Sequence, residues 1–212
     1  MDDKGCLIIM VKFPEPGKVK TRLGREIGMS RAAGIYSRFV LEMLAKCRQI
    51  NFFSLLSCHP DRPARDYHDW LGNNYSLIVQ NGSDLGSIMH NSFEQVFELG
   101  FSRVILTGSD IPHLPVSYIQ TAFSRLKDHD LVIGPALDGG YFLLGANKGS
   151  FIPEIFKNIP WSTPAVYSLT MEKIHENNLK CFVLPTLRDI DTLDDLKDFY
   201  SARGQSLNNT PP

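Results

Sequence analysis

Apolar residues recur along the whole chain in two patterns, as short continuous runs and as longer stretches with helical spacing. A continuous run such as residues 6–12 is typical of a strand that is buried on both faces of a parallel sheet. From Ser30 onward, apolar residues return every three or four positions, which predicts an amphipathic helix with one buried face. The expected strands are 6–12, 52–58, 76–80, 103–107, 130–135, 141–146 and 180–184, and the expected helices are 30–47, 62–71, 85–99, 115–127, 152–157, 165–176 and 192–201.

Strands and helices alternate from one end of the chain to the other. This order predicts a single α/β domain over residues 1–201, built around a mostly parallel central sheet. Residues 202–212 are polar, so we expect a flexible tail there.

The composition is that of an ordinary globular protein. Hydrophobic residues make up 43% and charged residues 21%, which argues against a disordered chain, a collagen-like repeat or a coiled coil. The formal net charge of −1 gives no indication of nucleic-acid or membrane binding. The apolar run near the N-terminus is too short to span a bilayer, and the acidic residues before it are the reverse of a secretory leader, so we expect a cytoplasmic protein. The 4 cysteines lie far apart, which predicts buried free thiols rather than a zinc site or disulfides.

The segment after the first expected strand concentrates positive charge. Residues 12–25 contain five basic residues and one acid, although the whole chain has a net charge of −1. Prolines stiffen such a loop, glycine lets the backbone approach a ligand, and lysine and arginine bind phosphate. The loop lacks the glycine motifs of P-loop and dinucleotide-binding proteins, so it indicates another kind of phosphate site or, more simply, a solvated basic loop. The candidate phosphate contacts are Lys12, Pro16, Gly17, Lys18, Lys20, Thr21 and Arg22.

A carboxylate follows the strand expected at 103–107. Asp110 comes after Gly108 and Ser109, at the strand end where open α/β sheets bind ligands. A carboxylate in this place can hold Mg²⁺ or Mn²⁺ against a diphosphate. The simpler interpretation is that Asp110 caps a turn.

Two later segments combine acids with turn signals. Asp138 precedes Gly139 and Gly140, which implies tight backbone geometry or close approach of a ligand, although Asp138-Gly139 also suits a plain hairpin turn. Near the end of the chain, Asp191 and its neighbour Thr192 come just before an expected helix, and either residue suits a simple N-cap.

Five motifs, in this order, resemble the DUF2064 family, also called radical-SAM/selenodomain-associated or glycosyltransferase-like transferases. They run from about residue 7 to about residue 198, which is nearly the whole chain. The resemblance implies a nucleotide-diphospho-sugar transferase of GT-A fold, with three α/β/α layers, a nucleotide-binding N-terminal half and an acceptor-binding C-terminal half. The motifs are Lys12-x-Pro14-x-Pro16-Gly17-x-Val19-Lys20-Thr21-Arg22-Leu23, Gly108-Ser109-Asp110-x-Pro112, Gly134-Pro135-Ala136-x-Asp138-Gly139-Gly140-Tyr141, Pro160-Trp161-Ser162-Thr163 and Asp189-x-Asp191-Thr192.

A more distant similarity to phospholactate and molybdenum cofactor guanylyltransferases implies roles for single residues. It assigns metal binding to Asp110 and to Asp189 or Asp191. It assigns phosphate binding to the basic first loop, at Lys12, Lys20 and Arg22, and implies that Asp138 lies near the acceptor.

The chain departs from the family pattern in one motif. It has Asp84-Leu85-Gly86-Ser87-Ile88-Met89 where members usually have Asp-Leu-Gly-Glu-Arg-Met, so an acid and an arginine are missing. This departure puts nucleotide specificity, or activity itself, in question.

Three functions remain open from the sequence. The first is metal-dependent glycosyl transfer from a nucleotide-sugar to a small-molecule acceptor, in which Lys20 and Arg22 stabilise the leaving group and Asp138 is the base. The second is nucleotidyl transfer from a nucleoside triphosphate to a phosphorylated acceptor, with release of pyrophosphate. The third is nucleotide binding without catalysis, suggested by Ser87 and Ile88.

Further candidate contacts for the nucleotide or the acceptor come from the other motifs. Trp161 suits an acceptor pocket and a packed core equally well. These candidates are Asp84, Gly108, Ser109, Gly139, Gly140, Tyr141, Trp161, Ser162 and Thr163.

Overall fold

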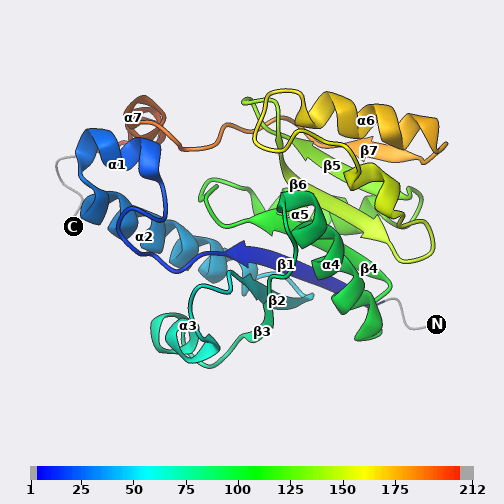
Figure 1. Ribbon diagram of the computed structural model, residues 1–212, viewed down its shortest axis with the longest axis horizontal. Coiled ribbons are helices and arrows are strands. Elements are labelled where there is room, and N and C mark those ends of the chain that lie inside the picture. Colours follow the sequence, from blue (N-terminus) through cyan, green and yellow to red (C-terminus); the bar gives the residue numbers. More distant parts are fainter. Residues whose placement is uncertain (1–3, 206–212) are drawn as a thin grey trace.

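The computed structural model describes residues 4–205. The strands of this part of the chain form one mixed sheet. The described strands follow the spatial order β3-β2-β1-β4-β6-β5-β7 (Figure 1). β1 pairs in parallel with β2 and β4, whereas β6 runs antiparallel to both β4 and β5. The strands are β1 (Gly5–Val11), β2 (Phe53–Cys58), β3 (Ser76–Val79), β4 (Arg103–Gly108), β5 (Leu131–Pro135), β6 (Tyr141–Asn147) and β7 (Cys181–Val183).

This topology brings distant loops to one edge of the sheet. All of the described strands except β6 run in the same direction, since β2, β3 and β4 follow β1 and the two antiparallel pairings of β6 restore that direction in β5 and β7. The segments after β1, β4, β5 and β7 therefore leave the sheet at the same edge, where ligands bind in open α/β sheets.

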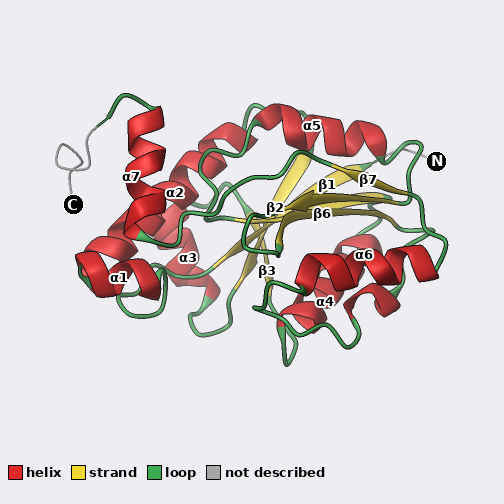
Figure 2. Cartoon of the chain, turned by 90° about the horizontal axis from the view of Figure 1, so that it is seen from above, coloured by secondary structure: helices red, strands yellow, loops and turns green. Residues whose placement is uncertain are grey.

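Helices cover both faces of the sheet and complete the predicted three-layer arrangement. In Figure 2, α2 and α5 lie on one side of the strands, and α4 and α6 lie on the other. Alternate side chains of β1 serve the two faces: Leu7 and Ile9 belong to the core under α2 and α5, and Cys6 and Ile8 to the core under α4. The helices are α1 (Thr21–Ile27), α2 (Met29–Cys47), α3 (Ala64–Leu71), α4 (Leu85–Glu98), α5 (Val116–Arg125), α6 (Val166–Glu176) and α7 (Leu193–Ala202), with a 3₁₀ helix η1 (Pro153–Phe156).

A third core cluster joins the beginning and the end of the chain. Leu23 of α1, Phe39 of α2 and Leu196 of α7 are buried together. Figure 1 shows α1 and α7 side by side at one end of the molecule, although most of the sequence separates them.

The expected elements are present with boundaries within a few residues, and the structure adds one helix. The basic loop is expected over residues 12–25 and no helix is expected before Ser30, but Thr21–Ile27 forms α1. Its apolar signal is a single pair at helical spacing, Leu23 and Ile27, which is too short to distinguish a helix from a loop. Packing against α2 and α7, rather than local pattern, therefore stabilises this short helix.

Other expectations can be compared directly with the described residues. All four cysteines are free, and Cys6, Cys47 and Cys58 are buried. The segment 152–157 is the 3₁₀ helix η1 rather than an α-helix. The expected tail begins at the last residue of α7, and its residues 206–212 lie outside the described part of the chain. No helix among the described residues has the length and apolarity needed to cross a membrane.

Candidate active site

The basic loop is anchored to two other elements through one tyrosine. The backbone N–H of Lys12 donates to Tyr36 Oη at 3.0 Å, and this hydroxyl also lies 2.9 Å from Ser109 Oγ. Burial raises the pKa of Tyr36 to about 12, so it stays a neutral hydroxyl. The loop after β1, the helix α2 and the loop after β4 are thereby held in one arrangement.

Lys20 stands at the centre of the site. Its side chain is 3% exposed, and its ammonium lies 3.0 Å from Asp110 Oδ2 and 2.9 Å from Asp191 Oδ1. Burial alone would lower the pKa of this ammonium, but the two carboxylate charges outweigh that effect and raise it. Desolvation would raise the pKa of Asp110, and Lys20 reverses this and holds it low. Lys20 and Asp110 are therefore both charged near neutral pH.

Asp189 has the opposite character. Partial burial raises its pKa to about 7, and the charges of Asp110 and Asp138 add to the shift. Its Oδ1 atom is buried and has no hydrogen-bond partner among the described residues. This oxygen could therefore accept a hydrogen bond from a ligand or coordinate a cation.

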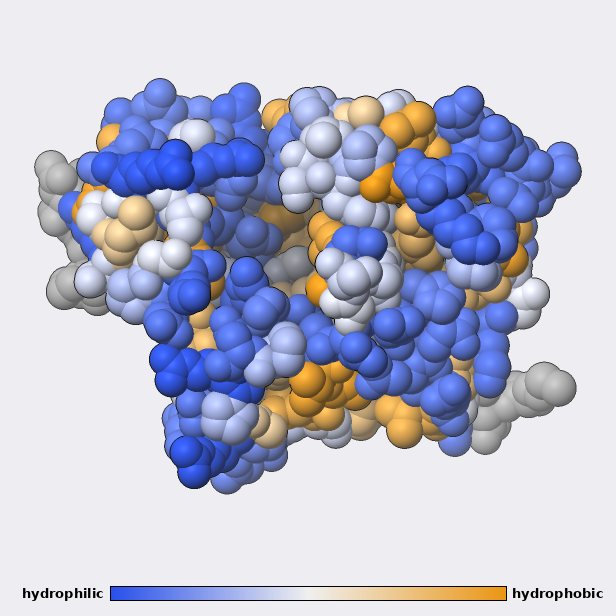
Figure 3. Space-filling view, in the orientation of Figure 1, coloured by the Kyte–Doolittle hydropathy of each residue, from blue (hydrophilic) through white to orange (hydrophobic). Residues whose placement is uncertain are grey.

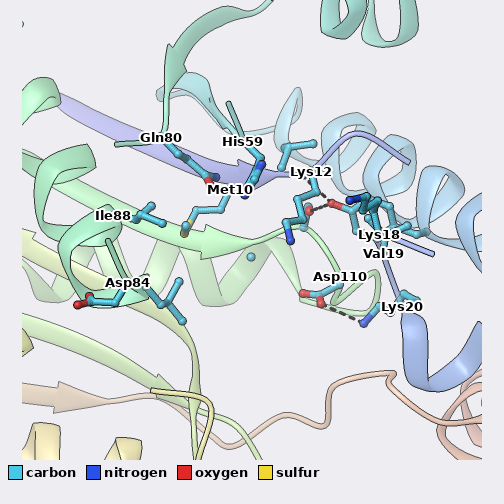
Figure 4. A pocket seen from close by; sticks show the side chains of 15 residues that line it. Met10, Lys12, Lys18, Val19, Lys20, His59, Gln80, Asp84, Ile88 and Asp110 are labelled. Atoms are coloured by element: carbon cyan, nitrogen blue, oxygen red, sulfur yellow. Dashed lines mark hydrogen bonds and ion pairs between the residues drawn. The ribbon is translucent and has the colours of Figure 1, made fainter. Parts of the chain in front are cut away.

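The first cavity lies at the carboxyl ends of β1 to β4 and measures about 540 Å³. Figure 4 shows the lysines of the first loop at one end, with Lys12 pointing into the space, and Met10, Gln80 and Ile88 at the other end. Positive charge is thus gathered at one end, while the other end combines the apolar Met10 and Ile88 with the polar Gln80 and Asp84, which suits the phosphates and the base of a nucleotide respectively. The lining residues are Met10, Val11, Lys12, Lys18, Val19, Lys20, Tyr36, His59, Gln80, Asp84, Leu85, Ile88, Gly108, Ser109 and Asp110.

The second cavity measures about 490 Å³ and is acidic. Its lining contains one basic residue, Arg22, and three acidic residues, Asp138, Asp189 and Asp191. Arg22 Nη1 lies 3.4 Å from Asp191 Oδ2. The space-filling view shows a hollow in the middle of the face that separates the side of α1 from the side of α6 (Figure 3). The lining residues are Arg22, Leu85, Met89, Asp138, Gly140, Tyr141, Trp161, Ser162, Thr163, Pro164, Val166, Asp189 and Asp191.

The two cavities share one lining residue. Leu85, at the start of α4, lines both of them and is 41% exposed. Lys20 and Asp110 line the first cavity, and Asp191 lines the second. The bridge from Asp110 through Lys20 to Asp191 therefore lies between them, where a group could pass from one ligand to the other.

Most candidate residues from the sequence come together here. Asp110 and Asp191 serve neither as a plain turn cap nor as an N-cap, since both bind Lys20 and Thr192 caps α7. Asp138 combines both interpretations, because its Oδ1 accepts from the Gly140 N–H at 2.9 Å while the residue lines the second cavity. Four candidates line neither cavity: Pro16, Gly17, Thr21 and Gly139.

Trp161 is both packed and accessible. Its indole lies against Gly86, where an added Cβ would come within 2.4 Å of the ring, and it lines the second cavity. The sequence motif around Gly86 and the Trp161 motif therefore build one wall.

The departure at Ser87 has a structural role. Ser87 N–H donates to Asp84 Oδ1 at 2.8 Å, and the Asp84 N–H donates to Ser87 Oγ at 3.1 Å. This is a capping box at the start of α4. Serine thus closes the box, and Ile88, in place of the family's arginine, extends the apolar end of the first cavity.

Several lining residues were missed by sequence reasoning. Tyr36 lies within the helix expected at 30–47, where its spacing marks it only as a core position, and its hydroxyl contact depends on Ser109, far along the chain. His59 directly follows β2, and Gln80 directly follows β3. Their positions at the carboxyl ends of strands, where ligands bind in open α/β sheets, could have identified them as lining residues.

The candidate metal ligands fit a divalent cation only in part. Among residues 4–205, no group of three or more His, Cys, Asp or Glu side chains is arranged to hold a metal ion. Mg²⁺, however, is commonly bound by one or two carboxylates together with substrate phosphates and water. Asp110 and Asp191, joined by Lys20, and the unpartnered oxygen of Asp189 supply donors of this kind.

Comparisons with known proteins agree with this geometry. A family model described as "Uncharacterized protein conserved in bacteria (DUF2064)" matches residues 43–163. The chain belongs to the DUF2064 family. No curated protein sequence matches the chain.

Solved structures share the fold of this DUF2064 chain. A "putative nucleotide-diphospho-sugar transferase" from Desulfovibrio desulfuricans G20 is 38% identical, covers 96% of this chain and 89% of its own, and has a TM-score of 0.92. CMP:2-keto-3-deoxy-manno-octonic acid synthetase, complexed with CTP, shares the fold at 10% identity over 95% of this chain and 98% of its own, with a TM-score of 0.59. Rv0371C of Mycobacterium tuberculosis H37Rv, in complex with manganese, does so at 11% identity over 94% and 99%, with a TM-score of 0.58. The 38%-identical structure agrees with the predicted transferase class, and all three agree with the predicted fold.

Proposed function

We propose that the protein transfers a glycosyl group from a nucleotide-sugar to a small-molecule acceptor. The observation that carries this proposal is the contrast between two adjoining cavities. Three lysines and two carboxylates line the first, whereas one arginine and three carboxylates line the second. A polyanionic donor suits the first cavity, and an acceptor without phosphate suits the second.

The donor is bound through its diphosphate. Lys12 and Lys18 line the first cavity and have exposed side chains, so they are free to contact phosphate oxygens. Arg22, whose side chain is 69% exposed, stabilises charge on the departing diphosphate. Lys20 holds Asp110 and Asp191 in place at the junction and adds its positive charge there.

Asp138 is the base that receives the proton of the acceptor. Its Oδ1 is oriented by the Gly140 N–H at 2.9 Å, which leaves Oδ2 for the acceptor hydroxyl. The hydroxyl proton passes to Asp138, and the acceptor oxygen bonds to the anomeric carbon of the sugar. The bond from that carbon to the diphosphate breaks, and its electron pair leaves with the nucleoside diphosphate.

Asp110, Asp191 and Asp189 are the residues that would hold Mg²⁺ or Mn²⁺. The buried, unpartnered Asp189 Oδ1 supports this assignment. Such an ion, when bound, neutralises diphosphate charge.

Nucleotidyl transfer is the second candidate. The lysine-rich first loop favours it, because a nucleoside triphosphate carries more charge than a nucleotide-sugar. The second cavity opposes it, because a phosphorylated acceptor would face three carboxylates.

Product analysis distinguishes these functions. A thermal-shift screen first identifies the nucleotide that binds: the purified protein is tested against nucleotide-sugars and nucleoside triphosphates, with and without Mg²⁺ or Mn²⁺. A ligand at about 100 times its Kd adds roughly 2.7 kcal/mol of stability. The products formed from the bound nucleotide are then analysed. Transfer or slow hydrolysis of a bound donor should release nucleoside diphosphate. Pyrophosphate release would establish the second candidate instead, and binding without any turnover would leave a nucleotide-binding protein.

Matched variants test the site assignment. Lys12→Ala and Lys18→Ala should each weaken donor binding about tenfold, since each removes one charge-assisted phosphate contact. Lys127→Ala, an exposed lysine that lines neither cavity, is the control. Asp138→Asn should keep donor binding and lower transfer by roughly 10²-fold or more. Equal donor binding by all the lysine variants would contradict the assignment of the first cavity.

A further inference from the structure

The second cavity has an aromatic corner. The rings of Tyr141 and Trp161 both line it, with their centroids 6.4 Å apart and their planes at 82°. At this distance the two rings pack edge to face and leave no room for a ligand between them, so a ligand in the cavity lies beside the pair. The faces of such rings attract cations.

Negative charge without a partner lies in the same cavity. Asp191 is neutralised by Lys20 and Arg22, but Asp138 and Asp189 form no ion pair with a basic residue among the described residues. The Asp189 Oδ1 atom is buried and accepts no hydrogen bond within residues 4–205. A positively charged ligand in this cavity of about 490 Å³ would offset the charge of the exposed Asp138 and would favour the ionised form of Asp189.

We propose that the acceptor bound in this cavity is a small organic cation, an amine or quaternary ammonium compound that carries a hydroxyl group. Its positive centre lies against the Trp161 and Tyr141 rings, between Asp138 and Asp189. Ser162 lines the same cavity and offers its hydroxyl to the polar remainder of the molecule. The assignment of this ligand as the acceptor rests on the proposed glycosyl transfer, whereas its binding does not.

Choline and its uncharged carbon isostere test the charge requirement. Isothermal titration calorimetry is performed on the full chain after treatment with a chelator, so that no metal ion competes for the carboxylates. Choline should bind at least about tenfold more tightly than the isostere, which has the same shape and no charge. Equal affinities, or no binding of choline, would overturn the proposal.

Variants locate the binding. Asp138→Asn and Trp161→Leu should each weaken choline binding about tenfold, while Asp128→Asn and Trp70→Phe should not change it. Asp128 and Trp70 line neither cavity, and Asp138 is exposed, so Asp138→Asn remains informative if Trp161→Leu does not fold. Unchanged binding in Asp138→Asn would overturn the proposal.

Two further arms separate the alternatives. Mn²⁺ that binds to the chelator-treated protein while choline does not would show that the unpaired carboxylates serve a metal only, and would overturn the proposal. Choline binding in a protein that binds no nucleotide-sugar would support the cationic site and contradict glycosyl transfer.

Discussion

Lys20 has a strained backbone conformation and a buried charge at the centre of the candidate site. Its backbone φ is 44°, in the left-handed region that costs a residue with a side chain roughly 1 kcal/mol or more. The buried ammonium nevertheless meets Asp110 and Asp191 from segments far apart in sequence. Strain of this kind persists where surrounding contacts outweigh it.

Removing the charge of Lys20 should destabilise the protein. Lys20→Met keeps the length of the side chain and leaves two carboxylates without their counter-ion, so we expect the free energy of unfolding to fall by about 1–3 kcal/mol. The loss is below that of a fully buried pair, because Asp110 is 41% and Asp191 36% exposed. Urea unfolding measures it. Lys18→Met, at an exposed lysine of the same loop, should change stability little; equal effects would show that the bridge does not stabilise the fold.

Asp189 should make stability depend on pH. Its pKa is raised from 3.8 to about 7, so between these values the unfolded chain is ionised while the folded carboxyl keeps its proton. Folding then binds a proton, and stability falls as the pH rises from about 4 to about 7. Asp189→Asn should lose this part of the pH dependence and become more stable than the wild type above pH 7, as urea unfolding at several pH values would show. Parallel curves for the two proteins would contradict the raised pKa.

At the scale of elements, short turns set the shape of the second cavity. Gly139 lies between β5 and β6 with φ of +88°, and a Cβ there would come within 2.2 Å of the Pro164 carbonyl oxygen. Pro164 itself lines the cavity. Gly139 thus acts on the site through the backbone beside it.

Gly139→Ala should therefore lower stability by more than about 1 kcal/mol and weaken ligand binding in the second cavity. Gly149→Ala is the matched control, because a Cβ at that position meets nothing within 4 Å and its φ is not in the left-handed region. Thermal unfolding compares the two variants. A neutral Gly139→Ala would mean that the turn can move away from Pro164.

At the scale of the whole molecule, the contact between α1 and α7 assembles the site. Lys20 immediately precedes α1, and Asp191 lies two residues before α7. Glu26 of α1 accepts the Leu193 N–H at 3.2 Å, and Leu196 is fully buried between the helices. The two helices, once packed, bring the lysine and the carboxylate together.

Leu196→Ala should lower the free energy of unfolding by about 2–4 kcal/mol and weaken nucleotide binding, since it loosens this contact. Leu99→Ala, at a leucine that is 64% exposed, should leave both unchanged. Urea unfolding and calorimetric titration of the nucleotide give the two readouts. Loss of stability with unchanged nucleotide affinity would show that the site does not depend on the helix pair.

Much of this arrangement could be read from the sequence, because the signals were local. Continuous apolar runs predicted every described strand, and the position of Asp110 after a strand predicted a site at that edge. Helix α1 offered only one pair at helical spacing, Leu23 and Ile27, and its stability comes from packing against α2 and α7. The contacts of Tyr36 with Lys12 and Ser109 likewise depend on tertiary packing, so no local pattern indicates them.

Local sequence is enough to define the order of strands and helices, the loops that carry charge and the identity of the chemical groups. These properties depend on residues close together along the chain, through periodicity, capping and turn preference. Only the tertiary structure decided that Lys20 joins Asp110 to Asp191, that the acids divide between two cavities and that Trp161 faces one of them. Those facts depend on the parallel strand order and on helix packing, which bring together side chains as far apart as Lys20 and Asp191.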